Sequence, residues 1–110
     1  MNIRDLISQK SPSFSLEFFP PKEKSDQEDF FARVEKMKKV DPSFVSITCG
    51  AGGSSSDRTL ETASRLQNGL GLETMAHLTC LGSKRKEVES NLSQLQESNI
   101  NNVLALRGDP

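Results

Sequence analysis

The sequence lacks several features that mark common functional classes. Its 14 Lys and Arg are balanced by 15 Asp and Glu, for a net charge of −1, which argues against the concentrated positive charge that nucleic acids and anionic membranes attract. The longest apolar run is Val103 to Leu106, far short of the roughly 20 residues that span a bilayer. Arg4, Asp5 and Lys10 interrupt the region where a signal peptide would have its apolar core. We therefore expect a cytoplasmic protein without nucleic-acid or membrane partners.

Metal-binding and nucleotide-binding patterns are also incomplete. The chain has one histidine and two cysteines, Cys49 and Cys80, with no CxxC pair, so we expect reduced thiols and no metal site. The segment that follows the first predicted strand, Phe19 to Lys22, contains no GxGxxG. The later run Gly50-Ala51-Gly52-Gly53-Ser54-Ser55 has a serine where the third glycine belongs and no GK[ST] ending. The two incomplete glycine patterns argue against a dinucleotide-binding Rossmann fold, and the missing GK[ST] ending argues against a phosphate-binding loop.

What the sequence does contain is an alternation of short apolar runs with longer amphipathic ones, which is typical of parallel strands joined by helices. A Ser25/Glu28 capping box predicts the start of one helix, and Asp41-Pro42 predicts its end. Ser83 is the predicted cap of a later helix. The predicted strands are Phe14 to Phe19, Phe44 to Thr48, Thr74 to Thr79 and Val103 to Arg107, and the apolar helix positions between them are Phe30, Val34, Met37, Leu60, Ala63, Leu66, Leu70, Val88, Leu92 and Leu95.

The spacing of the strand ends predicts the architecture. Glu17, Thr48, Thr79 and Asp109 follow one another at intervals of 31, 31 and 30 residues, which matches one βα unit plus the next strand. Eight such units amount to about 250 residues, the size of a (β/α)8 TIM barrel. We therefore expect an α/β fold in which residues 1–110 are the N-terminal fragment of a single barrel domain, with about the first four strands. An open doubly wound sheet is the competing geometry.

Alternation along each strand separates an apolar face from a face that becomes polar toward the carboxyl end. The predicted apolar, helix-packing face includes Leu104 and Leu106 in the fourth strand. Ligands bind at the carboxyl ends of strands in α/β folds, so polar residues there are candidate site residues. They are Glu17, Thr48, His77, Thr79, Arg107 and Asp109.

Each candidate also has an ordinary explanation. An isolated Glu17 is more often a solvated edge residue or a salt-bridge partner than an acid catalyst, and a lone His77 is usually a structural residue with a satisfied ring. Arg107 and Asp109 are close enough in sequence to pair with each other. The stretch from Gly50 to Ser56 could cradle a phosphate through its backbone N–H groups, but without a GK[ST] ending a flexible loop is the favoured explanation.

Four stretches together resemble the methylenetetrahydrofolate reductase family, flavin-dependent enzymes of one-carbon metabolism. They occur in the family's order and run from near the start of the chain to its last residue. The stretches are Ser15-Leu16-Glu17-Phe18-Phe19-Pro20-Pro21-Lys22, Val45 to Gly53 with Asp57-Arg58-Thr59, His77-Leu78-Thr79-Cys80, and Leu104 to Pro110.

The resemblance implies a (β/α)8 barrel that binds FAD across the carboxyl ends of its strands. NAD(P)H would reduce the flavin, and the flavin would reduce 5,10-methylenetetrahydrofolate to 5-methyltetrahydrofolate for methionine biosynthesis. By the same resemblance Glu17 is the catalytic acid that protonates the folate, and Asp109 contacts both flavin and folate. Thr48, His77, Arg107 and Gly108 would contact FAD, and Thr48 would also face the nicotinamide.

Cys49 departs from the tyrosine common at its position in the family, which puts a local contact in doubt. The resemblance leaves homo-oligomerisation open. Because residues that hold the rest of the cofactor would lie in later strands, we expect the 110-residue chain alone to be inactive. The alternative is a non-catalytic α/β module that self-associates through its open sheet edge.

Overall fold

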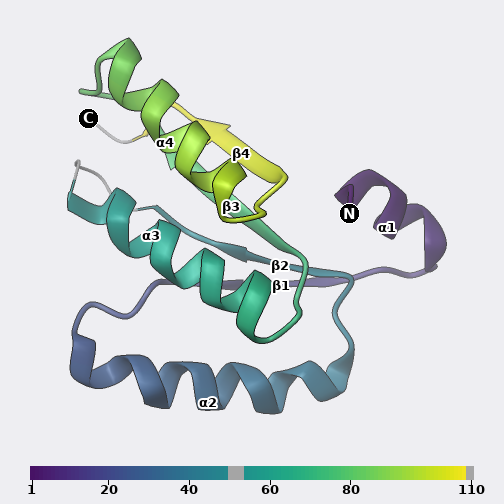
Figure 1. Cartoon of the computed structure of the whole chain (residues 1–110). Helices are drawn as coiled ribbons and strands as arrows, with labels where there is room; N and C mark the ends of the chain where they lie inside the picture. Colours follow the sequence, from purple (N-terminus) through teal and green to yellow (C-terminus); the bar gives the residue numbers. More distant parts are fainter. Residues whose placement is uncertain (50–53, 109–110) are drawn as a thin grey trace.

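The computed structural model describes residues 1–49 and 54–108. Four parallel strands form one sheet, in which they lie side by side in chain order (Figure 1). This arrangement confirms the α/β class and is that of the first half of a (β/α)8 barrel, whereas doubly wound sheets reverse their strand order. The strands are β1 (Ser15–Phe18), β2 (Phe44–Ile47), β3 (Thr74–Thr79) and β4 (Asn102–Leu106).

A crossover helix follows each of the first three strands, and all three helices cover the same face of the sheet (Figure 1). In the described part of the chain no helix is long and apolar enough to cross a membrane. The helices are α2 (Gln27–Met37), flanked by the 3-10 turns η1 (Lys24–Asp26) and η2 (Lys38–Val40), α3 (Ser54–Ser64), which continues as the π turn η3 (Arg65–Gly69), and α4 (Arg85–Glu97).

Both predicted serine caps are wrong. Ser25 lies inside η1, and α2 begins at Gln27 with Asp26 as its cap. Ser83 precedes Lys84, the actual cap of α4, and its backbone N–H donates to the Cys80 carbonyl at 3.1 Å. Ser83 thus belongs to the turn after β3 and not to the start of α4.

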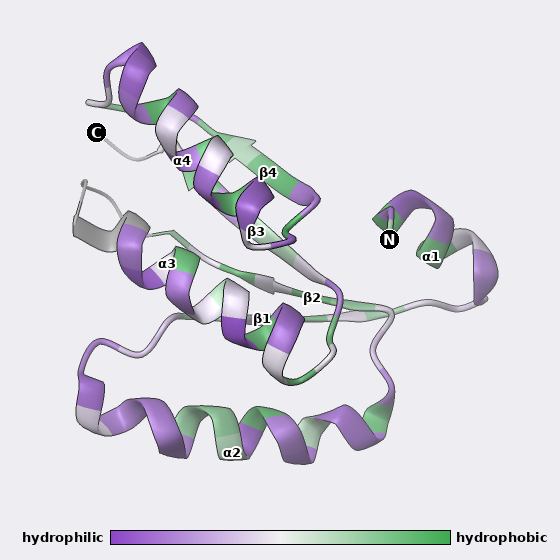
Figure 2. Ribbon diagram, viewed as in Figure 1, coloured by the Kyte–Doolittle hydropathy of each residue, from purple (hydrophilic) through white to green (hydrophobic). Residues whose placement is uncertain are grey.

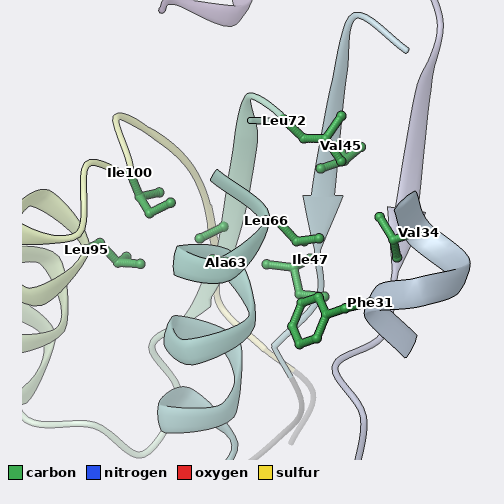
Figure 3. Close-up of a cluster of buried hydrophobic side chains, with 10 residues drawn as sticks. Phe31, Val34, Val45, Ile47, Ala63, Leu66, Leu72, Leu95 and Ile100 are labelled. Atoms are coloured by element: carbon green, nitrogen blue, oxygen red, sulfur yellow. The ribbon is translucent and has the colours of Figure 1, made fainter. Parts of the chain in front are cut away.

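The hydrophobic core lies between the sheet and the three helices (Figure 3). Val45 and Ile47 of β2 are fully buried against Leu66 of η3, and Phe31 and Val34 extend the cluster onto α2. Burial of each large aliphatic side chain stabilises the fold by about 1.5–3 kcal/mol. The helices show apolar stripes among hydrophilic residues (Figure 2), which is the pattern expected when only one side of a helix packs.

A short helix, α1 (Ile3–Gln9), lies beside the amino ends of the strands (Figure 1). The Asn102 side chain accepts from the Ile3 N–H at 3.2 Å and donates to the Met1 carbonyl at 2.9 Å. Glu73 accepts from the Met1 amine at 2.9 Å and from Asn102 at 3.0 Å. This network anchors the N-terminal segment at one end of the sheet and leaves the carboxyl ends of the strands at the other.

Candidate functional site

Strand register places Glu17 and His77 on the sheet face opposite the helices. Glu17 of β1 pairs with Ser46 of β2, and Ser46 pairs with Met75 of β3. Paired residues of neighbouring strands project from the same face, as do residues two positions apart on one strand. His77 therefore shares this face with Glu17, as the sequence predicts.

The two side chains meet there. His77 Nε2 lies 3.5 Å from Glu17 Oε1, and the Ser46 hydroxyl donates to the same oxygen over 3.5 Å. The His77 side chain is only 9% exposed and the Glu17 side chain is 57% exposed. The carboxylate is thus held on one side by buried groups and remains accessible from the other.

The buried Nε2 atom of His77 lacks a hydrogen-bond partner among the described residues. It lies within ion-pair distance of Glu17 Oε1, but Nε2 makes no hydrogen bond with any residue in the described ranges. Buried polar atoms in folded proteins nearly always have a partner, so an orphaned one calls for an explanation such as a bound ligand. A polar ligand group near the carboxyl ends of β2 and β3 would supply that partner.

Thr48 is fixed at the end of β2 by contacts on two sides. Its N–H donates to the Phe18 carbonyl at 3.0 Å, and its carbonyl accepts from the Thr59 hydroxyl of α3 at 2.9 Å. The next residue, Cys49, places its Sγ 3.6 Å from Thr79 Oγ1. These contacts tie together the carboxyl ends of β1, β2 and β3 and the middle of α3.

The chain folds over the end of β3 after it leaves β4. The Arg107 carbonyl accepts from the Leu81 N–H at 2.7 Å and from the Cys80 N–H at 3.3 Å. Gly108 has φ +94°, and a Cβ there would lie 3.1 Å from Thr79 Cβ. The backbone of residues 107 and 108 is therefore at the same rim as Thr79. Asp109 lies outside the described residues, as do Gly50 to Gly53.

The predicted faces of β4 are wrong. Leu104 pairs with His77 and Leu106 with Thr79, so both leucines lie on the candidate-site face, where they are 38% and 40% exposed. Val103 packs against the core on the helix side instead. The run from Val103 to Leu106 is apolar at every position, so alternation could not identify its faces. β4 ends at Leu106, and its alternation therefore does not determine the direction of the exposed Arg107 side chain.

The sequence pattern does not reveal that Ser46 contacts Glu17. Alternation does place it opposite Val45 and Ile47, but its pairing with Glu17 depends on the register of β1 against β2. Ser46 is 4% exposed, on an interior strand whose neighbouring residues are aliphatic. A buried serine in such a strand was the available signal.

Comparison with known proteins identifies relatives of this chain. The family model for methylenetetrahydrofolate reductase matches residues 2–110. The chain is 45% identical over 108 residues to methylenetetrahydrofolate reductase (NADH) 1 of Arabidopsis thaliana, covering 98% of this chain and 18% of that relative. It is 35% identical over 95 residues to 5,10-methylenetetrahydrofolate reductase of Pectobacterium carotovorum subsp. carotovorum, covering 86% of this chain and 32% of that relative. The chain therefore spans less than a fifth of the plant relative and about a third of the bacterial one.

Proposed function

Because this chain belongs to the methylenetetrahydrofolate reductase family, we propose that it forms the first three βα units and the fourth strand of a (β/α)8 barrel that reduces 5,10-methylenetetrahydrofolate to 5-methyltetrahydrofolate. NAD(P)H is the proposed electron donor, and the name of the Arabidopsis relative specifies NADH. The observation that carries the proposal is the convergence of Glu17 and His77, from β1 and β3, on one face of the sheet. A cytoplasmic location is part of the same proposal, which leaves homo-oligomerisation open.

The residues at the rim fit FAD as the cofactor. His77 Nε2 is a buried polar atom without a hydrogen-bond partner in the described chain, and a polar group of the cofactor would supply that partner. FAD, when bound, would carry a hydride from the nicotinamide to the folate. Thr48, His77, Arg107 and Gly108 would hold it, together with Asp109, which we also propose as a folate contact.

Glu17 is the proposed proton donor to the folate. Its carboxyl group is more than half exposed, so a substrate above the sheet can reach it. Oε1 faces Ser46 and His77, and Oε2 has no polar partner among the described side chains. The proton therefore leaves from Oε2. General acids of this kind contribute about 10²–10⁴-fold to rate.

The test uses a chimeric reductase in which residues 1–110 replace the matching segment of the Arabidopsis relative. Stopped-flow spectroscopy measures flavin reduction by NADH and flavin reoxidation by methylenetetrahydrofolate separately. We expect Glu17→Gln to slow reoxidation by about 10²-fold or more and to leave flavin reduction unchanged, because only the second half-reaction needs the proton. Glu35→Gln, an exposed carboxylate on α2, is the matched control. Equal loss in both half-reactions would remove Glu17 from the acid role.

A second candidate function is self-association of the 110-residue chain as a non-catalytic module. Leu104 and Leu106 of the edge strand β4 favour it, because both side chains are exposed on one face. The chimera separates the two functions, because the isolated half barrel should bind little flavin and show no activity in either case. A chimera that binds flavin and reduces the folate supports the catalytic barrel, and a folded chimera that does neither favours the non-catalytic module.

A further inference from the structure

Among the residues that the structure describes, the hydroxyl of Ser46 is the polar group beside Glu17 that has no part in the proposed catalytic role or the proposed cofactor contacts. Ser46 occupies the middle of β2, between β1 and β3, and is 4% exposed. Parallel strands buried on both faces normally carry Val, Ile or Leu at such positions, as Val45 and Ile47 do on either side of it. A serine at this position makes fewer apolar contacts than Val, Ile or Leu would, and its buried hydroxyl needs a hydrogen-bond partner within the protein.

That hydroxyl donates to Glu17. Ser46 Oγ lies 3.5 Å from Glu17 Oε1, the same oxygen that is 3.5 Å from His77 Nε2. Two buried groups on successive strands therefore approach one carboxylate oxygen from the side of the sheet. The other oxygen, Oε2, has no polar partner within residues 1–49 and 54–108. The two oxygens of Glu17 are thus in different environments, because Oε1 faces Ser46 and His77 and Oε2 has no such contact.

We propose that Ser46 is a positioning residue that fixes Glu17 with Oε1 toward the sheet and Oε2 toward the folate. This inference rests on the proposed acid role of Glu17. The donor–acceptor distance of 3.5 Å is long for a hydrogen bond, and catalytic hydrogen bonds are often long without substrate and tighten when substrate binds. A carboxyl on a half-exposed side chain samples several rotamers, and only a fixed one presents its proton in a productive geometry.

The test compares Ser46→Ala with Ser43→Ala in the chimeric reductase. Ser43 immediately precedes β2, and its Oγ is also buried but bonds no residue that the structure describes, so its removal deletes the same atom without affecting Glu17. We expect Ser46→Ala to lower the rate of flavin reoxidation by folate about tenfold, the effect of one lost hydrogen bond. Ser46→Ala should match Ser43→Ala in four other properties: the KM for folate, the rate of flavin reduction by NADH, the melting temperature and the flavin content. Ser46→Thr keeps the hydroxyl and should retain most of the rate.

A double-mutant cycle separates positioning from structural damage. In the Glu17→Gln background there is no acid to position, so adding Ser46→Ala should change reoxidation less than twofold. A tenfold loss in that background, or equal loss in both half-reactions, would show that Ser46 acts through packing and would overturn the inference. An unchanged rate in Ser46→Ala would overturn it as well. If Glu17→Gln itself fails to affect reoxidation selectively, the proposed function fails first, and that result is distinct from these.

Discussion

Gly108 shows how a single residue determines the shape of the rim. Its φ of +94° is in the region that residues with a side chain avoid, and a Cβ would lie 3.1 Å from Thr79 Cβ and 3.6 Å from Leu81 Cβ. The neighbouring Arg107 carbonyl accepts two backbone N–H groups from residues 80 and 81. A change at Gly108 therefore disturbs both the local backbone and the end of β3.

We expect Gly108→Ala to destabilise the chimeric reductase by about 1–3 kcal/mol, because the strained backbone conformation and the close contact add together. Gly69→Ala is the control, since a Cβ at Gly69 would meet nothing within 4 Å and its φ is not positive. That change should be neutral or slightly stabilising. Urea unfolding monitored by circular dichroism measures both variants, and equal stability of the two would contradict the argument.

At the scale of elements, the sequence predicts the strands and helices well because their signals are local. Apolar positions such as Val34 and Leu66 recur at helical spacing, and both are buried as expected. The predicted serine caps were wrong because Ser25 lies in the turn η1 and the Ser83 N–H is hydrogen-bonded in the turn after β3. Strand parity predicted that Glu17 and His77 share a face, but their contact and the Ser46 hydrogen bond both depend on the register between strands, which no local pattern encodes.

The docking of α1 offers a test at this scale. Asn102 makes three hydrogen bonds, to Met1, Ile3 and Glu73, that connect the N-terminal segment to the start of β4. We expect Asn102→Ala to loosen α1, because each lost bond leaves a partner unsatisfied at about 1–3 kcal/mol where it is buried. Trypsin should then cleave after Arg4 and Lys10 several-fold faster. Asn101→Ala, at the exposed neighbouring position, should cleave at the original rate; equal cleavage of both variants would mean that Asn102 does not hold the helix.

At the scale of the whole molecule, the sheet face that carries Glu17 is polar over β1 and β2 and apolar over β4. Leu104 and Leu106 lie on it beside His77 and Thr79. In a closed eight-stranded barrel this face becomes the interior, where layers of bulky aliphatic side chains fill the centre. The two exposed leucines are therefore suited to packing against further strands, and in the isolated sheet they form an apolar surface next to an open edge.

That surface predicts how the isolated chain behaves. In sedimentation velocity we expect the 110-residue chain to form concentration-dependent dimers or larger species, because pairing buries Leu104 and the β4 edge together. Leu104→Lys should shift it toward monomer, since a charge on this face resists burial. Leu92→Lys is the matched control: Leu92 is 41% exposed against 38% for Leu104, but it lies on α4, so this substitution should leave association unchanged. A wild-type chain that stays monomeric at every concentration, or equal effects of the two lysines, would show that the open strand edge does not drive assembly.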